Sequence, residues 1–119
     1  MDHRSVRLRR SSLEDGVNDS VLSGEFHVLM RSIYDRAKSQ CGYNATRFKK
    51  MLEEKGGVET AKTLLKAPTV SDGFVELYMR KRLDLTVEAQ LLENPQFWPL
   101  FTEAELDTAR RWLKEYREK

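Results

Sequence analysis

The chain has 119 residues, of which 39% are hydrophobic and 34% charged, a length and composition that suit one domain with a single hydrophobic core. Its 21 Lys and Arg against 19 Asp and Glu give a net charge of +2, so bulk charge alone does not mark a nucleic-acid binder. The single cysteine, Cys41, excludes an intrachain disulfide and a Cys-x-x-Cys metal or redox site.

Residues 1–22 are rich in arginine and serine and carry only scattered apolar residues. This composition predicts a flexible basic arm, followed by a helical domain over residues 23–119. No apolar region follows the basic N-terminus, and no stretch approaches the ~18 apolar residues of a membrane span. We therefore expect a cytoplasmic protein.

The first periodic segment runs from Gly24 to Cys41 and repeats apolar residues at helical spacing. Gly42 suits the left-handed position that ends such a helix. Asn44 is predicted to cap a second helix, which stops at the Gly56-Gly57 pair. A third helix begins at Val58 and ends before Pro68.

Ser71 or Asp72 starts a predicted fourth helix that ends in the basic triplet at residues 80–82. The next stretch, R-L-D-L-T-V-E-A, alternates as a strand would, but an isolated strand is unstable without a partner. We expect instead an extended segment, a cap at Thr86 and a short fifth helix that ends at Asn94-Pro95.

The clearest local signal is the S/T-x-x-E capping box formed by Thr102 and Glu105, with Phe101 and Leu106 as a hydrophobic staple. It predicts a last helix from Glu103 towards Lys119. Six short helices joined by short loops predict an all-α single domain, either orthogonal or bundle-like.

Catalytic signals are sparse. Asp84 and Glu88 are four residues apart and would present two carboxylates on one helix face, for a metal or for acid–base chemistry. The alternative is that they pair with Arg80 and Arg82 or support a helix N-terminus. Because no nucleotide-binding, zinc or kinase motif occurs, we predict a non-enzymatic protein without a metal or other cofactor.

The segment from Tyr43 to Ala67 resembles a helix-turn-helix in outline and has six bases against three acids, a net of +3. Solvated helix faces often have this composition, which is the alternative reading. The predicted nucleic-acid-binding residues are the six bases, Arg47, Lys49, Lys50, Lys55, Lys62 and Lys66.

Aromatic residues gather around Pro95 and Pro99. Large aromatics near a loop often anchor protein interfaces, so Phe97, Trp98 and Trp112 are predicted to bind a protein partner. The alternative is that these side chains close the mouth of the core.

Four segments, Y-N-A-T-R-F, G-V-E-T-A-K-T-L-L, R-L-D-L-T-V-E and L-F-T-E-A-E-L, together resemble a recurrent family of small uncharacterised bacterial proteins and C-terminal domains. The resemblance spans about Glu25 to Tyr116 and carries over no catalytic or binding residue. It implies a bacterial cytosolic origin and a module that also works attached to other domains.

These observations lead to two functional hypotheses. The first is a non-enzymatic protein-interaction or regulatory module of a bacterial cytosolic system. The second is a nucleic-acid-associated accessory protein that binds through the basic helices and the N-terminal arm.

Overall fold

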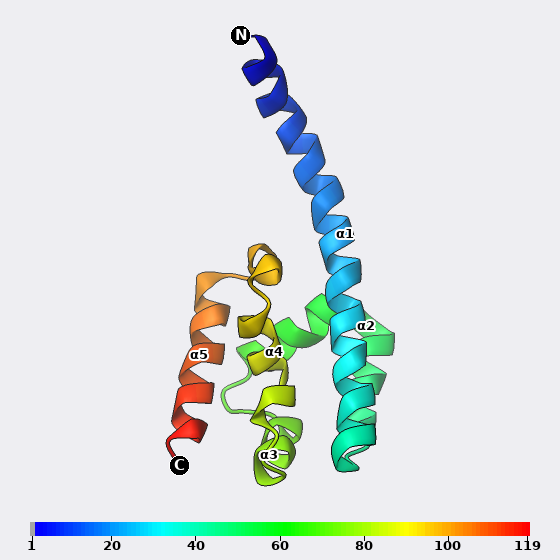
Figure 1. Cartoon of the computed structure of the whole chain (residues 1–119), viewed down its shortest axis with the longest axis vertical. Coiled ribbons are helices and arrows are strands. Elements are labelled where there is room, and N and C mark those ends of the chain that lie inside the picture. The colour runs from blue at the N-terminus through cyan, green and yellow to red at the C-terminus, as the bar shows by residue number, and fades with distance from the viewer. Residues whose placement is uncertain (1) are drawn as a thin grey trace.

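A computed structural model describes the backbone of residues 2–119 and the side chains of residues 19–119. Within this range all regular secondary structure is helical, which confirms the predicted all-α fold (Figure 1). The elements in chain order are α1 (Asp2–Cys41), α2 (Thr46–Lys66), α3 (Asp72–Met79), the 3-10 helix η1 (Leu83–Leu85), α4 (Val87–Glu93), the 3-10 helix η2 (Pro95–Leu100) and α5 (Glu103–Arg117).

The first helix is longer than the sequence indicates. Its backbone is helical from Asp2, whereas the periodic pattern predicts a start at Gly24. The side chains of residues 1–18 lie outside the described residues, so the division between an N-terminal arm at 1–22 and a domain at 23–119 stays a prediction. At the other end, α1 stops as expected before Gly42, which has a φ of 69°.

The predicted break between the second and third helices is a kink inside α2. Gly56 there has φ 82° and ψ 170°, values that favour glycine, and helical geometry resumes at once. The expected N-cap at Asn44 is wrong. The helix begins at Thr46 without a side-chain cap, because the Asn44 Oδ1 accepts a hydrogen bond of 2.7 Å from the Tyr34 hydroxyl instead.

Helix α3 begins as predicted, with the Ser71 hydroxyl accepting a hydrogen bond from the Phe74 backbone N–H. It ends at Met79, before the basic triplet that was expected to close it, and Lys81 takes a left-handed φ of 62°. The expected extended segment is the 3-10 turn η1 (Leu83–Leu85).

The last two caps agree with the sequence prediction. The Thr86 Oγ1 accepts a hydrogen bond of 3.1 Å from the Ala89 N–H at the start of α4, and that helix ends at Glu93, before Asn94 and Pro95. Both hydrogen bonds of the capping box at α5 are present, between Thr102 and Glu105.

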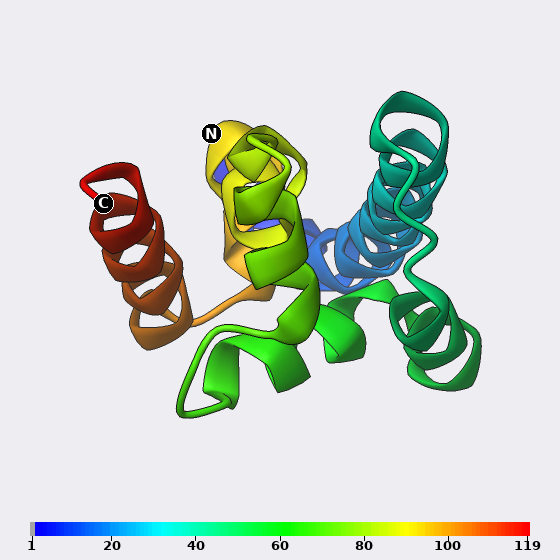
Figure 2. The ribbon, with the colours of Figure 1, turned by 90° about the horizontal axis from the view of Figure 1, so that it is seen from below.

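The long first helix and the kinked second helix lie side by side, with α4 between α1 and α5 (Figures 1 and 2). A Cβ atom on Gly57 would lie only 2.7 Å from the His27 Cα, so α1 and α2 need a glycine at this contact. The N-terminal half of α1 extends away from the other helices (Figure 1), and the molecule measures 57 × 29 × 23 Å.

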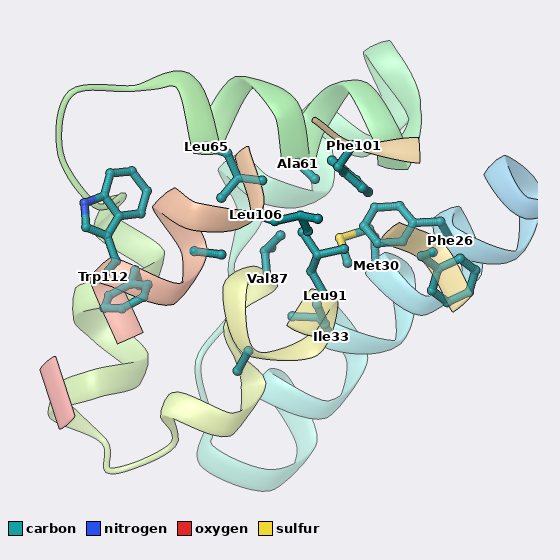
Figure 3. Packing of buried hydrophobic residues seen from close by; sticks show 14 of the residues in the cluster. Phe26, Met30, Ile33, Ala61, Leu65, Val87, Leu91, Phe101, Leu106 and Trp112 are labelled. Atoms are coloured by element: carbon teal, nitrogen blue, oxygen red, sulfur yellow. The ribbon is translucent and has the colours of Figure 1, made fainter. Parts of the chain in front are cut away.

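The larger of two apolar clusters within residues 19–119 joins the helices, and the smaller one consists of Ala37, Leu77 and Leu85. Phe26 on α1 lies edge-on against Phe97 and Phe101, with ring centroids 5.3 and 5.2 Å apart. Other members from α1, α2, α4 and α5 converge on the same centre, as Figure 3 shows for Met30, Ile33, Ala61, Leu65, Val87, Leu91 and Leu106. Trp112 belongs to the same cluster and lies at its edge in this view. Among the described residues, no helix has the length and apolar character that a membrane span requires.

Candidate functional site

A pocket of about 300 Å³ lies where α1, α2, α3 and α4 meet. Most of its wall is apolar, with side chains such as Ile33, Phe48 and Phe74. The loop between α2 and α3 adds Val70 and Ser71. Concave, mostly apolar sites with a few polar groups are the usual form of small-molecule sites. We refer to it below as the Glu88 pocket.

The pocket is named after the buried carboxylate in its wall. Glu88 is only 2% exposed, and its Oε2 atom has no hydrogen-bond partner. The cap formed by Thr86 places Glu88 in the first turn of α4, between the buried residues Val87 and Ala89. Most carboxylates with so little exposure are paired, so an unpartnered oxygen here is unusual.

Burial has a direct effect on the chemistry of this group. It raises the pKa of Glu88 to about 7, since the charged form loses hydration, and a hydrogen bond from its own backbone N–H lowers the pKa only in part. Near neutral pH the carboxyl group is therefore present in both forms. A carboxyl group with such a pKa, set in a cavity wall, is a typical feature of a functional site.

Several of the other polar groups that line the pocket are already engaged. The Tyr34 hydroxyl donates to Asn44, and the Thr86 hydroxyl donates to the Leu83 carbonyl oxygen at 2.8 Å. At the exposed side, Arg47 forms an ion pair of 3.3 Å with Asp72. The hydroxyls of Tyr43 and Thr69 also line the pocket and form no hydrogen bond within the described chain, so Glu88 is the buried one among the lining groups that have hydrogen-bonding capacity left.

Tyr43 lines the same pocket next to this exposed ion pair. Burial, and then the nearby carboxylates of Glu76 and Asp72, raise the pKa of its phenol group. The Arg80 guanidinium lies over the Tyr43 ring at 5.3 Å. The phenol therefore stays protonated at neutral pH, and its ring contributes to the wall.

The structure separates the two carboxylates that the sequence placed together. Asp84 is exposed, and Arg82 donates two hydrogen bonds to it at 2.9 and 3.0 Å. This hydrogen bonding is the main reason that the pKa of Asp84 lies below its ordinary value. Asp84 does not line the Glu88 pocket, and the described residues hold no cluster of three His, Cys, Asp or Glu for a metal. Asp84 therefore pairs with Arg82 as the alternative reading expected, and Glu88 lies in the first turn of a helix, α4.

The predicted aromatic interface lies mostly in the core. Phe97 and Trp112 are buried. Trp98 is half-buried, its indole N–H donates to the Leu91 carbonyl oxygen at 2.8 Å, and Arg110 lies over its ring at 5.4 Å. These positions favour the alternative in which the aromatics close the core, and solvent reaches only Trp98 among the three.

The six predicted nucleic-acid-binding bases have different environments. Lys62 is half-buried and donates to Glu105 at 2.9 Å, with its ammonium 5.1 Å from the centre of the Phe101 ring. Lys49 is also half-buried and lies over Tyr34. The remaining four are exposed, namely Arg47, Lys50, Lys55 and Lys66.

The sequence analysis considered Glu88 either as half of a carboxylate pair or in a structural role beside Arg80 and Arg82, and it did not predict the pocket. The five residues Val87 to Leu91 are all buried. The short helix α4 therefore has no alternation of polar and apolar faces from which a cavity wall could be predicted. The signal available in the sequence was a carboxylate inside the apolar run V-E-A-Q-L-L.

Comparisons with protein-family models, curated proteins and solved structures found no match. The resemblance to a bacterial family stays a prediction, and the chemistry of the site rests on the residues of this chain.

Proposed function

We propose that this chain is a non-enzymatic regulatory or accessory module of a bacterial cytosolic system, and that it acts by binding a small, mostly apolar molecule in the Glu88 pocket. The observation that carries the proposal is the unpartnered Glu88 carboxylate in an apolar cavity of about 300 Å³. A buried polar group without a partner destabilises the folded chain, and a bound ligand would supply the missing hydrogen bond.

The state of the other lining groups supports binding rather than catalysis. Nucleophilic catalysis needs a hydroxyl or thiol with a base within hydrogen-bond reach. The hydroxyls of Tyr34, Ser71 and Thr86 are used in hydrogen bonds of the fold, and the two other lining hydroxyls, of Tyr43 and Thr69, have no histidine beside them in the wall. A ligand that orders the junction of four helices could in turn alter how a protein partner binds, which is the regulatory part of the proposal.

The binding proposal is tested by titrating two probes, 2-phenylethanol and 2-phenylethylamine, into the ¹⁵N-labelled chain and following the amide resonances by NMR. For fragments of this size we expect a Kd of about 1 mM or below, with shifts around the pocket. The Val70→Phe variant places a ring in the pocket and should weaken binding at least about tenfold, which corresponds to roughly 1.4 kcal/mol.

Val75→Phe is the matched control, because Val75 is exposed on α3 and does not line the pocket. It should leave both affinities unchanged. The proposal fails if neither probe, up to about 10 mM, gives binding that Val70→Phe weakens and Val75→Phe does not.

A nucleic-acid-associated accessory role is the second proposal. It is supported by the exposure of Arg47, Lys50 and Lys55 on α2, whose surface contacts are weak enough to be exchanged for phosphates. Affinity should then fall steeply as salt rises from about 50 to 200 mM, since counterions are released on binding. Absence of any DNA or RNA shift at about 50 mM salt would exclude this role.

A further inference from the structure

We infer that the ligand of the Glu88 pocket is a small apolar monoamine, whose protonated nitrogen binds the Glu88 carboxylate while its hydrocarbon body fills the cavity. This inference rests on the proposed function and specifies the chemical class of the ligand. It is argued from the free acceptor, from the charges around the pocket and from the apolar wall.

The first argument concerns hydrogen bonding. The Glu88 Oε2 is an acceptor with no partner and less than 1 Å² of exposed surface, so a ligand N–H group would satisfy it once the carboxyl group turns towards the pocket that Glu88 lines. A ligand that offered only acceptors would leave this oxygen unpaired whenever the carboxyl group is ionised.

The second argument concerns charge. The charged groups that line the pocket besides Glu88 are Arg47 and Asp72, which neutralise each other across 3.3 Å. The remaining titratable groups in the wall are the phenols of Tyr34 and Tyr43. No cation therefore compensates an ionised Glu88, so the site favours a cationic ligand and repels an anionic one.

The third argument concerns the size and the wall. A volume of about 300 Å³ is at the small end of the range for ligand sites, and side chains such as Ile33, Met51 and Leu77 make its surface mainly apolar. A cation with a single charged end and an aliphatic or aromatic body matches both features. A polyamine would leave further charges against the apolar wall, which is unfavourable.

The test compares the affinity of 2-phenylethylamine with that of its neutral analogue 2-phenylethanol and of the anion 3-phenylpropionate, by NMR titration at about pH 8. The amine should bind at least about tenfold more tightly than the alcohol, and the anion should bind most weakly. From about pH 6 to pH 8 the affinity for the amine should rise roughly tenfold, because Glu88 ionises over this interval, while the affinity for the alcohol should change little.

Glu88→Gln is the decisive variant, because it keeps the shape of the side chain and removes its charge. It should remove both the preference for the amine and the pH dependence. Glu93→Gln, the same change at an exposed position of the same helix, should preserve both. Circular dichroism of each variant verifies that it is folded.

The outcomes separate this inference from the proposed function. Suppose that the alcohol or the anion binds as tightly as the amine, at a site where Val70→Phe weakens binding. The pocket is then a ligand site, but the amine assignment is wrong. A preference for the amine that survives in Glu88→Gln also overturns the assignment. If no probe binds in that site, the proposed function fails and the inference fails with it.

Discussion

Burying the Glu88 carboxyl group should make the folded chain less stable as the pH rises. Its pKa is 4.5 when exposed and about 7 in the fold. Between these pH values the folded chain binds more protons than the unfolded chain. The contribution of Glu88 to the free energy of unfolding is therefore largest below about pH 4.5 and falls as the pH rises to about 7. The loss amounts to about 3 kcal/mol in total.

Glu88→Gln should therefore stabilise the chain more at high pH than at low pH. The difference in unfolding free energy between variant and parent should be about 2 kcal/mol larger at about pH 8 than at pH 5. Urea unfolding at the two pH values measures it, and any fixed cost of burying the amide cancels. Glu93→Gln, at an exposed position, should give the same difference at both; equal values for Glu88→Gln would contradict the burial argument.

Single residues differ in how well the sequence predicts them. The caps at Ser71, Thr86 and Thr102 were predicted because each bonds a backbone N–H only three residues away. Asn44 was predicted wrongly because its partner, Tyr34, lies on the preceding helix. The burial of Glu88 depends on four helices meeting, which no local pattern encodes.

At the scale of elements, a buried ion pair connects the N-terminal end of α5 to α2. Glu105 lies in the first turn of α5 and accepts a hydrogen bond of 2.9 Å from Lys62 of α2. Burial raises the pKa of Glu105, but hydrogen bonds from the Thr102 N–H and from Lys62 outweigh it and hold the pKa below its ordinary value. The sequence predicted the cap, whereas the partner from 43 residues away could not be read from local spacing.

Lys62→Ala should destabilise the chain by about 1–3 kcal/mol, because it removes the closest partner of a buried carboxylate. Lys66→Ala is the matched control. The Lys66 side chain is 69% exposed, against 20% for Lys62, and its nitrogen is 3.8 Å from Glu105. We expect a cost of about 0–1 kcal/mol for it in urea unfolding. Equal costs for the two variants would refute the assignment of the buried pair.

The contact between α1 and α2 makes a second prediction at this scale. Gly57→Ala should destabilise the chain by about 1–3 kcal/mol, because the new Cβ would lie 2.7 Å from the backbone of His27. Gly24→Ala provides the comparison, since nothing lies within 4 Å of a Cβ there. It should stabilise helix α1 by about 0.5–1 kcal/mol. Thermal unfolding of both variants decides, and a neutral Gly57→Ala would mean that the helices can separate without cost.

At the scale of the whole molecule, the sequence predicted the fold class and the succession of helices but not the shape. The periodic apolar pattern begins near Phe26 and indicates where α1 contacts the core. It contains no information on backbone that continues as a helix beyond the core. The radius of gyration of 16.4 Å exceeds the roughly 13 Å of a compact chain of 100 residues, because α1 extends past the other helices (Figure 1).

Residues 2–20 should therefore be dispensable for folding. At about 1.5 Å per residue they account for roughly half of the long axis of the molecule. Among residues 19–119, whose side chains the structure describes, the first that belongs to the core or packs against it is Leu22. A chain shortened to begin at Val21 should keep its unfolding free energy within about 0.5 kcal/mol, while its radius of gyration in small-angle X-ray scattering should fall towards about 13 Å.

Shortening the chain from its other end provides the control. Removing residues 111–119 deletes Trp112 and Leu113, which are buried in the core, so this chain should lose its cooperative unfolding transition. A loss of more than about 1 kcal/mol in the chain that begins at Val21 would instead show that the N-terminal segment stabilises the core. The same comparison tests the division into an arm and a domain, because only a separable segment can be removed without affecting the remaining helices.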